Sequence, residues 1–339
     1  MLRITLLSGE ELTSIAVEDV HDVKALKQQL NKMYGLPPRF RQRLLHDGQT
    51  LDDAFNLDLP MDLQVVLTTF AEPSDSQKEQ LFFAARDGFV SEVQALLQLP
   101  MDPDAVPSFP AGDDRVEEML LCSLFEPEFS EPTALILAVR MNHPEVVQQL
   151  LLEAGAKANF ANPCGWTALL SASKGSGAQV VQLLLEAGAD VNYVNYDSEY
   201  CGENLAAGWS NGCTALMLAA ESGCAQVVQL LLQAGAHVNS ANKHGSTALM
   251  EATRNGQAVI VQMLLEAGAH VNSADRHGST ALTATKATRR NHDQIIQTLL
   301  EAGAQCSDGS GGRRSPDRPR SGEQPRVFNK VWRQGGRCN

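Results

Sequence analysis

Histidine is the residue type of this chain whose chemistry is most open, because imidazole can bind a metal or move a proton near neutral pH. The sequence has eight histidines. His237 and His270 lie 33 residues apart, and so do His244 and His277. Recurrence at one fixed interval is what duplication of a segment produces. We therefore interpret these residues as ordinary surface residues rather than as metal ligands or catalytic bases.

The other reactive groups form no recognisable catalytic or metal-binding pattern. The seven cysteines, at positions 122, 164, 201, 213, 224, 306 and 338, include no Cys-x-x-Cys pair and lack zinc-site spacing. The sequence contains no nucleophile-elbow, phosphate-loop or His-Glu-x-x-His motif. It therefore predicts no catalytic residues, no metal, no cofactor and no enzyme activity.

Aromatic side chains that could bind a protein gather in one region. The chain has four tyrosines and three tryptophans. Four of them lie in or beside a stretch at about 196–210, namely Tyr193, Tyr196, Tyr200 and Trp209, and Trp166 lies at the turn of the same repeat unit. Tyr and Trp are frequent binding hot spots because they offer large, stiff contact areas. We hypothesise a protein-binding site here. The alternative is that the rings fold back and cover an end of the inner core.

A repeated pattern determines the elements that must carry these residues. Gly-x-Thr-Ala-Leu begins at Gly165, Gly212, Gly245 and Gly278, and the last three copies start 33 residues apart. A further copy at Pro132 lacks the leading glycine. After each copy, a leucine-rich segment ends in Ala-Gly-Ala. Such self-similarity is the signature of a repeat architecture.

The residues of one unit predict two short helices and a turn. The threonine precedes Ala-Leu and can cap free backbone amides at a helix start. Val227, Val228 and Leu231 form one stripe at helical spacing, which Leu230 and Leu232 widen. Gly235 can end that helix in the left-handed conformation. A helix pair cannot bury its own apolar face, so neighbouring units must stack.

These motifs closely resemble the ankyrin repeat. We expect an α-solenoid of about six repeats over residues 77–306, in units 77–101, 131–164, 165–195, 211–243, 244–276 and 277–306. Insertions interrupt it at about 102–130 and 196–210. The second and sixth units hold one and two extra residues between Thr and Gly, which leaves their local register open. The resemblance implies that a protein client binds on the concave face. It also implies that Asn192, Asn239 and Asn272 are substrates of an asparaginyl hydroxylase.

Residues 1–69 show a different period. Leu2, Ile4 and Leu6 alternate as in a strand, and residues 23–34 read as a helix that Gly35 ends. Val23, Leu26, Leu30 and Met33 share one face of that helix. Strands follow at 42–45 and 63–67. The segment therefore predicts a small α+β domain.

The segment resembles the ubiquitin-like β-grasp fold, most clearly at Gly35-Leu36-Pro37-Pro38 and Gln42-Arg43-Leu44-Leu45. The resemblance implies a docking patch at Leu7, Leu45 and Val66 for a ubiquitin receptor or a proteasome subunit. The alternative is that these three residues are core or scattered surface positions. No diglycine follows Leu67, so we expect a fixed docking module rather than a conjugated modifier.

Charge and composition complete the organisation. Residues 70–76 read as a linker, and residues 307–339 are low-complexity and predict a disordered basic tail. The tail carries eight basic and three acidic residues, whereas the whole chain has a net charge of −13. Such an acidic body disfavours nucleic acid and anionic membranes as partners. The irregular cysteines and the absence of a secretory signal predict reduced thiols and a cytoplasmic or nuclear location.

Two functions remain open at this point. The chain is either a monomeric protein-binding adaptor, or a structural scaffold in which the ubiquitin-like domain only caps or orients the repeats.

Overall fold

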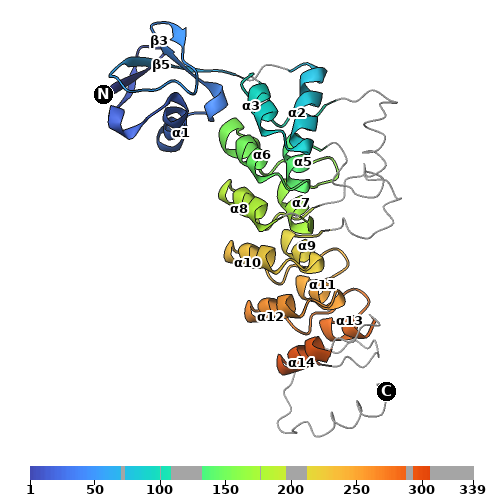
Figure 1. Ribbon diagram of the computed structural model, residues 1–339. Coiled ribbons are helices and arrows are strands. Elements are labelled where there is room, and N and C mark those ends of the chain that lie inside the picture. Colours follow the sequence, from blue (N-terminus) through green and yellow to red (C-terminus); the bar gives the residue numbers. More distant parts are fainter. Residues whose placement is uncertain are drawn as a thin grey trace, which may run out of the picture. The chain divides into compact units, whose positions relative to one another are not determined.

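The structure is a computed structural model, and it describes residues 1–69, 73–99, 101–107, 132–175, 177–195, 212–287 and 293–305. The chain forms two compact units, residues 1–237 and residues 238–339. The first unit contains a small sheet domain followed by helix pairs, and the second contains further helix pairs (Figure 1).

The N-terminal domain is a five-stranded mixed sheet with helix α1 (Val23–Tyr34) packed on one face. Its strands are β1 (Leu2–Leu6), β2 (Glu11–Ile15), β3 (Gln42–His46), β4 (Gln49–Thr50) and β5 (Asp62–Leu67), and two short 3₁₀ helices are η1 (Val17–Asp19) and η2 (Arg39–Arg41). The strand order is β2-β1-β5-β3-β4, with β1 and β5 parallel and the other neighbours antiparallel. This arrangement is compatible with the ubiquitin-like β-grasp.

Alternation along the strands builds the core of this domain. Alternate residues of β1, β3 and β5 are buried in the core that these strands share with α1, as at Leu2, Ile4, Leu44, Leu63 and Val65. Helix α1 begins where the Asp22 carboxylate accepts the Ala25 amide, and it ends at Gly35, whose φ is +64°. Three of the four apolar residues that share one face of α1 are buried, namely Val23, Leu26 and Leu30. The buried stripe ends at Leu30, and Met33, in the last turn, is 63% exposed.

Pairs of short helices follow, as the repeated pattern predicts. In the first unit they are α2 (Asp75–Asp87) and α3 (Val90–Leu97), α5 (Ala134–Arg140) and α6 (Pro144–Gln148) with its continuation η4 (Gln149–Ala154), α7 (Ala168–Gly175) and α8 (Ala178–Glu186), and α9 (Ala215–Ser222) and α10 (Ala225–Gln233). In the second unit they are α11 (Ala248–Arg254) and α12 (Ala258–Glu266), and α13 (Ala281–Ala287) and α14 (Asp293–Glu301). Within each unit, successive first helices contact one another, and so do successive second helices.

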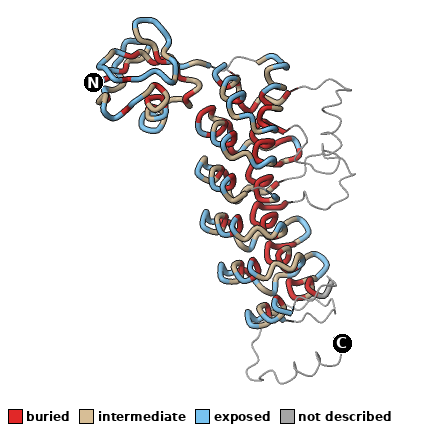
Figure 2. Tube along the Cα trace, in the orientation of Figure 1, coloured by how far each residue is buried: buried red, intermediate tan, exposed pale blue. Residues whose placement is uncertain are grey.

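The residues that were predicted to cap the helices and to line their buried side do so in the structure. The hydroxyls of Thr133, Thr214 and Thr247 accept backbone amides at the starts of α5, α9 and α11. Val227, Val228 and Leu231 are fully buried on α10. Apart from α2, the first helices of the pairs are buried over most of their described length, whereas the second helices expose one side (Figure 2).

Several predictions fall on segments outside the described residues. These segments are 70–72 of the linker, 108–131 and 196–211 of the insertions, 288–292 of the sixth unit, and the tail from 306. One expectation is corrected within the described part. Cys164 is disulfide-bonded, so the prediction of reduced thiols is wrong at this position.

Candidate protein-binding surfaces

The outer face of the N-terminal sheet carries the predicted docking residues. Val66 pairs with Arg43, and Leu45 pairs with Gln64 in the antiparallel register of β3 and β5. Because Leu44 and Val65 point into the core, these four residues lie on the opposite face of the sheet. Leu45 and Val66 are half-buried, and Leu7, just after β1, is 63% exposed. The three residues thus lie at an open face, and receptor binding there stays a prediction.

The predicted aromatic site is described only in part. Tyr196, Tyr200 and Trp209 lie outside the described residues. Trp166 is 1% exposed, the Lys174 ammonium lies 5.7 Å from its ring centroid, and its indole N–H has no hydrogen-bond partner. Tyr193 is half-buried. Burial of Trp166 agrees with the alternative of a structural role for this ring.

In four of the repeats, an asparagine near the end bridges to the next repeat. The Asn239 side chain donates to the Gly268 carbonyl at 3.0 Å and accepts the His270 amide at 2.7 Å. Asn159, Asn192 and Asn272 make the same pair of bonds to the unit that follows each of them. These side chains therefore satisfy backbone groups at successive turns. The hydroxylation that the resemblance implies stays a prediction.

A second candidate surface joins the N-terminal domain to the helix pair α5–α6. Arg39 is 1% exposed, and its guanidinium pairs with Asp53 at 2.7 Å and with Glu153 of η4. Asp53 also pairs with Lys27 at 2.6 Å. Glu153 is 8% exposed and lies 3.6 Å from the Lys24 ammonium. Buried charges of opposite sign thus alternate across this contact.

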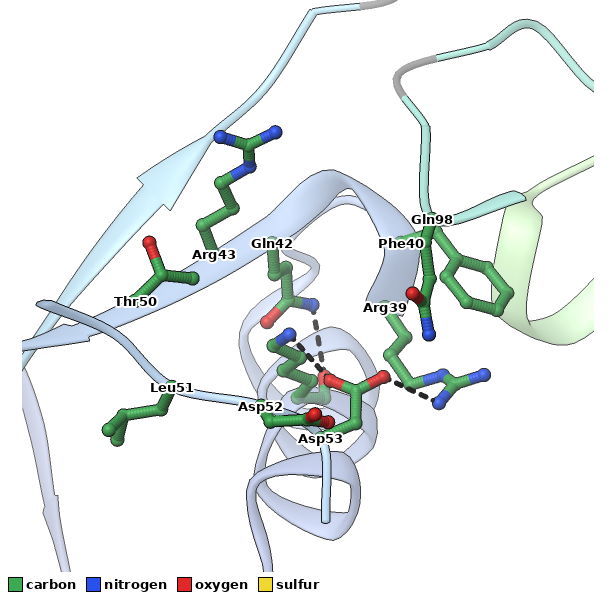
Figure 3. A pocket seen from close by; sticks show the side chains of 10 residues that line it. Arg39, Phe40, Gln42, Arg43, Thr50, Leu51, Asp52, Asp53 and Gln98 are labelled. Atoms are coloured by element: carbon green, nitrogen blue, oxygen red, sulfur yellow. Dashed lines mark hydrogen bonds and ion pairs between the residues drawn. The ribbon is translucent and has the colours of Figure 1, made fainter. Parts of the chain in front are cut away.

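A polar cavity of about 290 Å³ opens beside these charges, and Figure 3 shows the Asp53 carboxylate beside Arg39 at its base. Gln98, just after α3, lines the cavity together with residues of the N-terminal domain. The Gln42 amide donates to the carbonyls of Lys27 and Pro37 at 2.9 and 2.6 Å. The Gln42 oxygen and the Arg39 Nε are buried without hydrogen-bond partners. The cavity can therefore hold small polar groups or water.

A family model of ankyrin repeats matches the chain in three copies, over residues 81–195, 196–275 and 240–310. These matches cover well over half of the sequence. The chain belongs to the ankyrin-repeat family. Its members generally act by binding other proteins, through surfaces that the stacked repeats provide. No curated protein matches the chain.

Sequence reasoning missed the contact between Arg39 and Glu153. In the ankyrin repeats, Glu153 occupies a repeated position that also holds Glu186, Glu266 and Glu301, so its residue type carries no signal. The one feature of the sequence that set this repeat apart is its extra residue between Thr and Gly. That residue lies within the same helix as Glu153.

One carboxylate tethers the start of the first insertion to the repeats. Asp104 is 7% exposed, and both its oxygens accept the Lys157 backbone amide at 3.1 Å. Burial raises the pKa of the Asp104 carboxyl, and the hydrogen bond from Lys157 offsets part of this rise.

Two kinds of feature are absent from the part of the chain that the structure describes. No group of three or more His, Cys, Asp or Glu side chains there could hold a metal ion. No helix there is long and apolar enough to span a bilayer.

Proposed function

We propose that this chain is a non-enzymatic adaptor. Its ankyrin repeats, six if each helix pair is one repeat of a solenoid, bind a client protein. Its N-terminal domain, as a ubiquitin-like domain, docks to a ubiquitin-pathway receptor or to the proteasome. We place this activity in the cytoplasm or nucleus of the cell, with a monomeric chain and without nucleic-acid or membrane partners.

The observation that carries this proposal is the separation of two sides of the N-terminal domain. Leu45 and Val66 lie on the outer sheet face. The contacts to the repeats come instead from α1 and η2, through Lys24, Gln28 and Arg39. The domain can therefore rest on the repeats and still offer its sheet face. Two binding surfaces on one chain raise the effective concentration of one partner near the other.

A second function, the structural scaffold, is favoured by the buried contact between Arg39 and Glu153. Under this alternative, the N-terminal domain orients or caps the repeats and binds no receptor. The two functions differ in what the sheet face does, so a change confined to that face separates them.

The experiment compares Leu45→Glu/Val66→Glu with the control Leu59→Glu. Leu59 is 69% exposed and lies outside the strands. Affinities for purified proteasomes and for purified ubiquitin-binding domains are measured by surface plasmon resonance, with thermal unfolding as a check on folding. The adaptor predicts a loss of about 10-fold or more for the double variant, as for other central apolar contacts. Equal affinity of all three proteins, or no binding by any, would favour the scaffold.

We further propose that the aromatic residues at 196–210 contact the client. Changing Tyr196, Tyr200 and Trp209 together to alanine tests this. Lost client binding at an unchanged melting temperature supports the site. A large fall in melting temperature indicates instead that the rings cover the core.

A further inference from the structure

The second helices of the second to sixth repeats end in the same leucine-rich segment followed by Ala-Gly-Ala, yet the glutamate of the second repeat has different surroundings. Glu186, Glu266 and Glu301 are exposed, and each accepts a hydrogen bond from a glutamine four residues earlier, at 2.8, 3.0 and 2.7 Å. Glu153 holds the equivalent position in the second repeat. It is buried instead, and its partners belong to the N-terminal domain.

An additional glutamine explains this difference. The second repeat reads Val146-Val147-Gln148-Gln149-Leu150, where the third reads Val180-Val181-Gln182-Leu183. The helix holds the extra residue as a π-helical turn over Gln149–Ala154. A π turn shifts the residues that follow it relative to the α-helical register. Glu153 consequently makes no hydrogen bond to the residue four positions earlier, Gln149, whose side-chain oxygen is buried without a partner.

The N-terminal domain supplies a matching charge. Within that domain, Lys27 and Arg39 share the single carboxylate of Asp53. Both cations are more than nine-tenths buried. Glu153 provides the second carboxylate, and Lys24 and Gln28 of α1 lie 3.6 and 3.4 Å from it. A buried cation without a full partner is strongly unfavourable, so Arg39 requires Glu153 wherever it is covered from water.

The shapes of the two surfaces match as well. A Cβ built on Gly155 would lie 2.5 Å from Cγ of Pro38. The equivalent Gly188, Gly235, Gly268 and Gly303 have open space at the same place. The helix-ending glycine of the second repeat is therefore the one among these that a neighbouring domain touches.

We infer that the extra glutamine has converted an ordinary repeat position into a docking site whose partner is the chain's own N-terminal domain. Glu153 is the central residue of this site. Gly155 has no side chain and therefore lets Pro38 pack closely beside it. Docking through this site holds the domain at a fixed place on the second repeat. This inference is independent of receptor binding at the sheet face, which lies on other residues.

The experiment follows the tumbling of the N-terminal domain in the full chain, by ¹⁵N relaxation of its backbone amides. Three variants are compared with the native chain. Glu153→Gln removes the charge and introduces the residue that the fourth repeat holds at the equivalent Gln233. Deletion of Gln149 gives the second repeat the length of its neighbours. Glu186→Gln is the matched control, because Glu186 is exposed and does not contact the domain.

In the native chain and in the control, amides of the domain and of the repeats are expected to report one rotational correlation time. In Glu153→Gln and in the deletion, the domain's value is expected to become about two-fold shorter than that of the repeats. Unchanged repeat resonances show that the repeats remain folded. Separate correlation times in the native chain would overturn the inference, and so would equal times in all four proteins. A native mass that doubles with concentration in light scattering would overturn docking within one chain in favour of a second copy.

Discussion

The asparagine bridges show how single residues join the repeats. Asn159, Asn192, Asn239 and Asn272 each bond both a carbonyl and an amide of the following unit. The sequence pattern singles out Asn192, Asn239 and Asn272, but it does not show the partners of these residues, which lie about one repeat away. The histidines at 237 and 270 take part only through their backbone amides.

Replacement of Asn239 should destabilise the second compact unit, residues 238–339. Asn239→Ala removes two hydrogen bonds, and we expect a loss of about 1–2 kcal/mol in the free energy of unfolding. His270→Ala keeps the backbone amide that Asn239 accepts, so it should stay within about 0.5 kcal/mol of the native chain. Urea unfolding followed by circular dichroism measures both. Equal losses in the two variants would contradict the bridging role.

Asp104 should lower the free energy of unfolding as pH rises, which is opposite to the effect of a carboxyl group whose pKa is lowered by folding. Its carboxyl has a folded-state pKa above the ordinary 3.8, so the folded chain binds more protons than the unfolded chain. Its contribution to stability is therefore greatest below 3.8 and falls as pH rises through the raised value. Asp104→Asn cannot ionise and keeps an acceptor for the Lys157 amide. Urea unfolding across this pH range should show the native chain losing stability relative to Asp104→Asn as pH rises. Parallel curves for the two proteins would contradict this.

At the scale of elements, local signals predicted the helices well. The threonine caps, the apolar stripe of α10 and the end of α1 at Gly35 depend on neighbouring residues in sequence, and each is present as predicted. Met33 shares a face of α1 with three buried residues and is nevertheless exposed, because periodicity alone does not show where the sheet beneath a helix ends.

The site at Glu153 could not be predicted in the same way. The extra residue of the second repeat was visible, but a one-residue insertion can form a loop, a kink or a π turn. The choice among these three structures depends on how the inserted residue packs against the neighbouring surface. Here the turn places Glu153 at Arg39, which lies 114 residues earlier in the chain. Residue type, spacing and periodicity contain no information on such a long-range partner.

The helix-ending glycines offer a matched test of this contact. Gly155 and Gly188 have φ values of +78° and +82°, so alanine at either position should lose about 1–2 kcal/mol from the left-handed conformation alone. Gly155→Ala should lose about 1 kcal/mol more, because its methyl group would overlap Pro38. Urea unfolding of both variants measures the difference. Equal losses would contradict close packing at Gly155.

At the scale of the whole molecule, the N-terminal domain and the first repeats share one compact unit. The domain contributes two surfaces with different chemistry. Buried, alternating charges face the second repeat, and apolar residues of the sheet face remain open. Because buried charges require an exactly placed partner, the first surface suits a permanent contact within the chain, whereas binding at the second surface stays a proposal.

The most direct test of this account is a double-mutant cycle between Arg39 and Glu153. The free energies of unfolding of Arg39→Met, Glu153→Gln and the double variant are measured in urea. Each single change removes one partner of a buried charge and should lose about 3–5 kcal/mol. The double variant should lose less than the sum of the two, with a coupling of about 1–3 kcal/mol. Losses that add within about 0.5 kcal/mol would show that the two residues do not interact, and would contradict a fixed N-terminal domain.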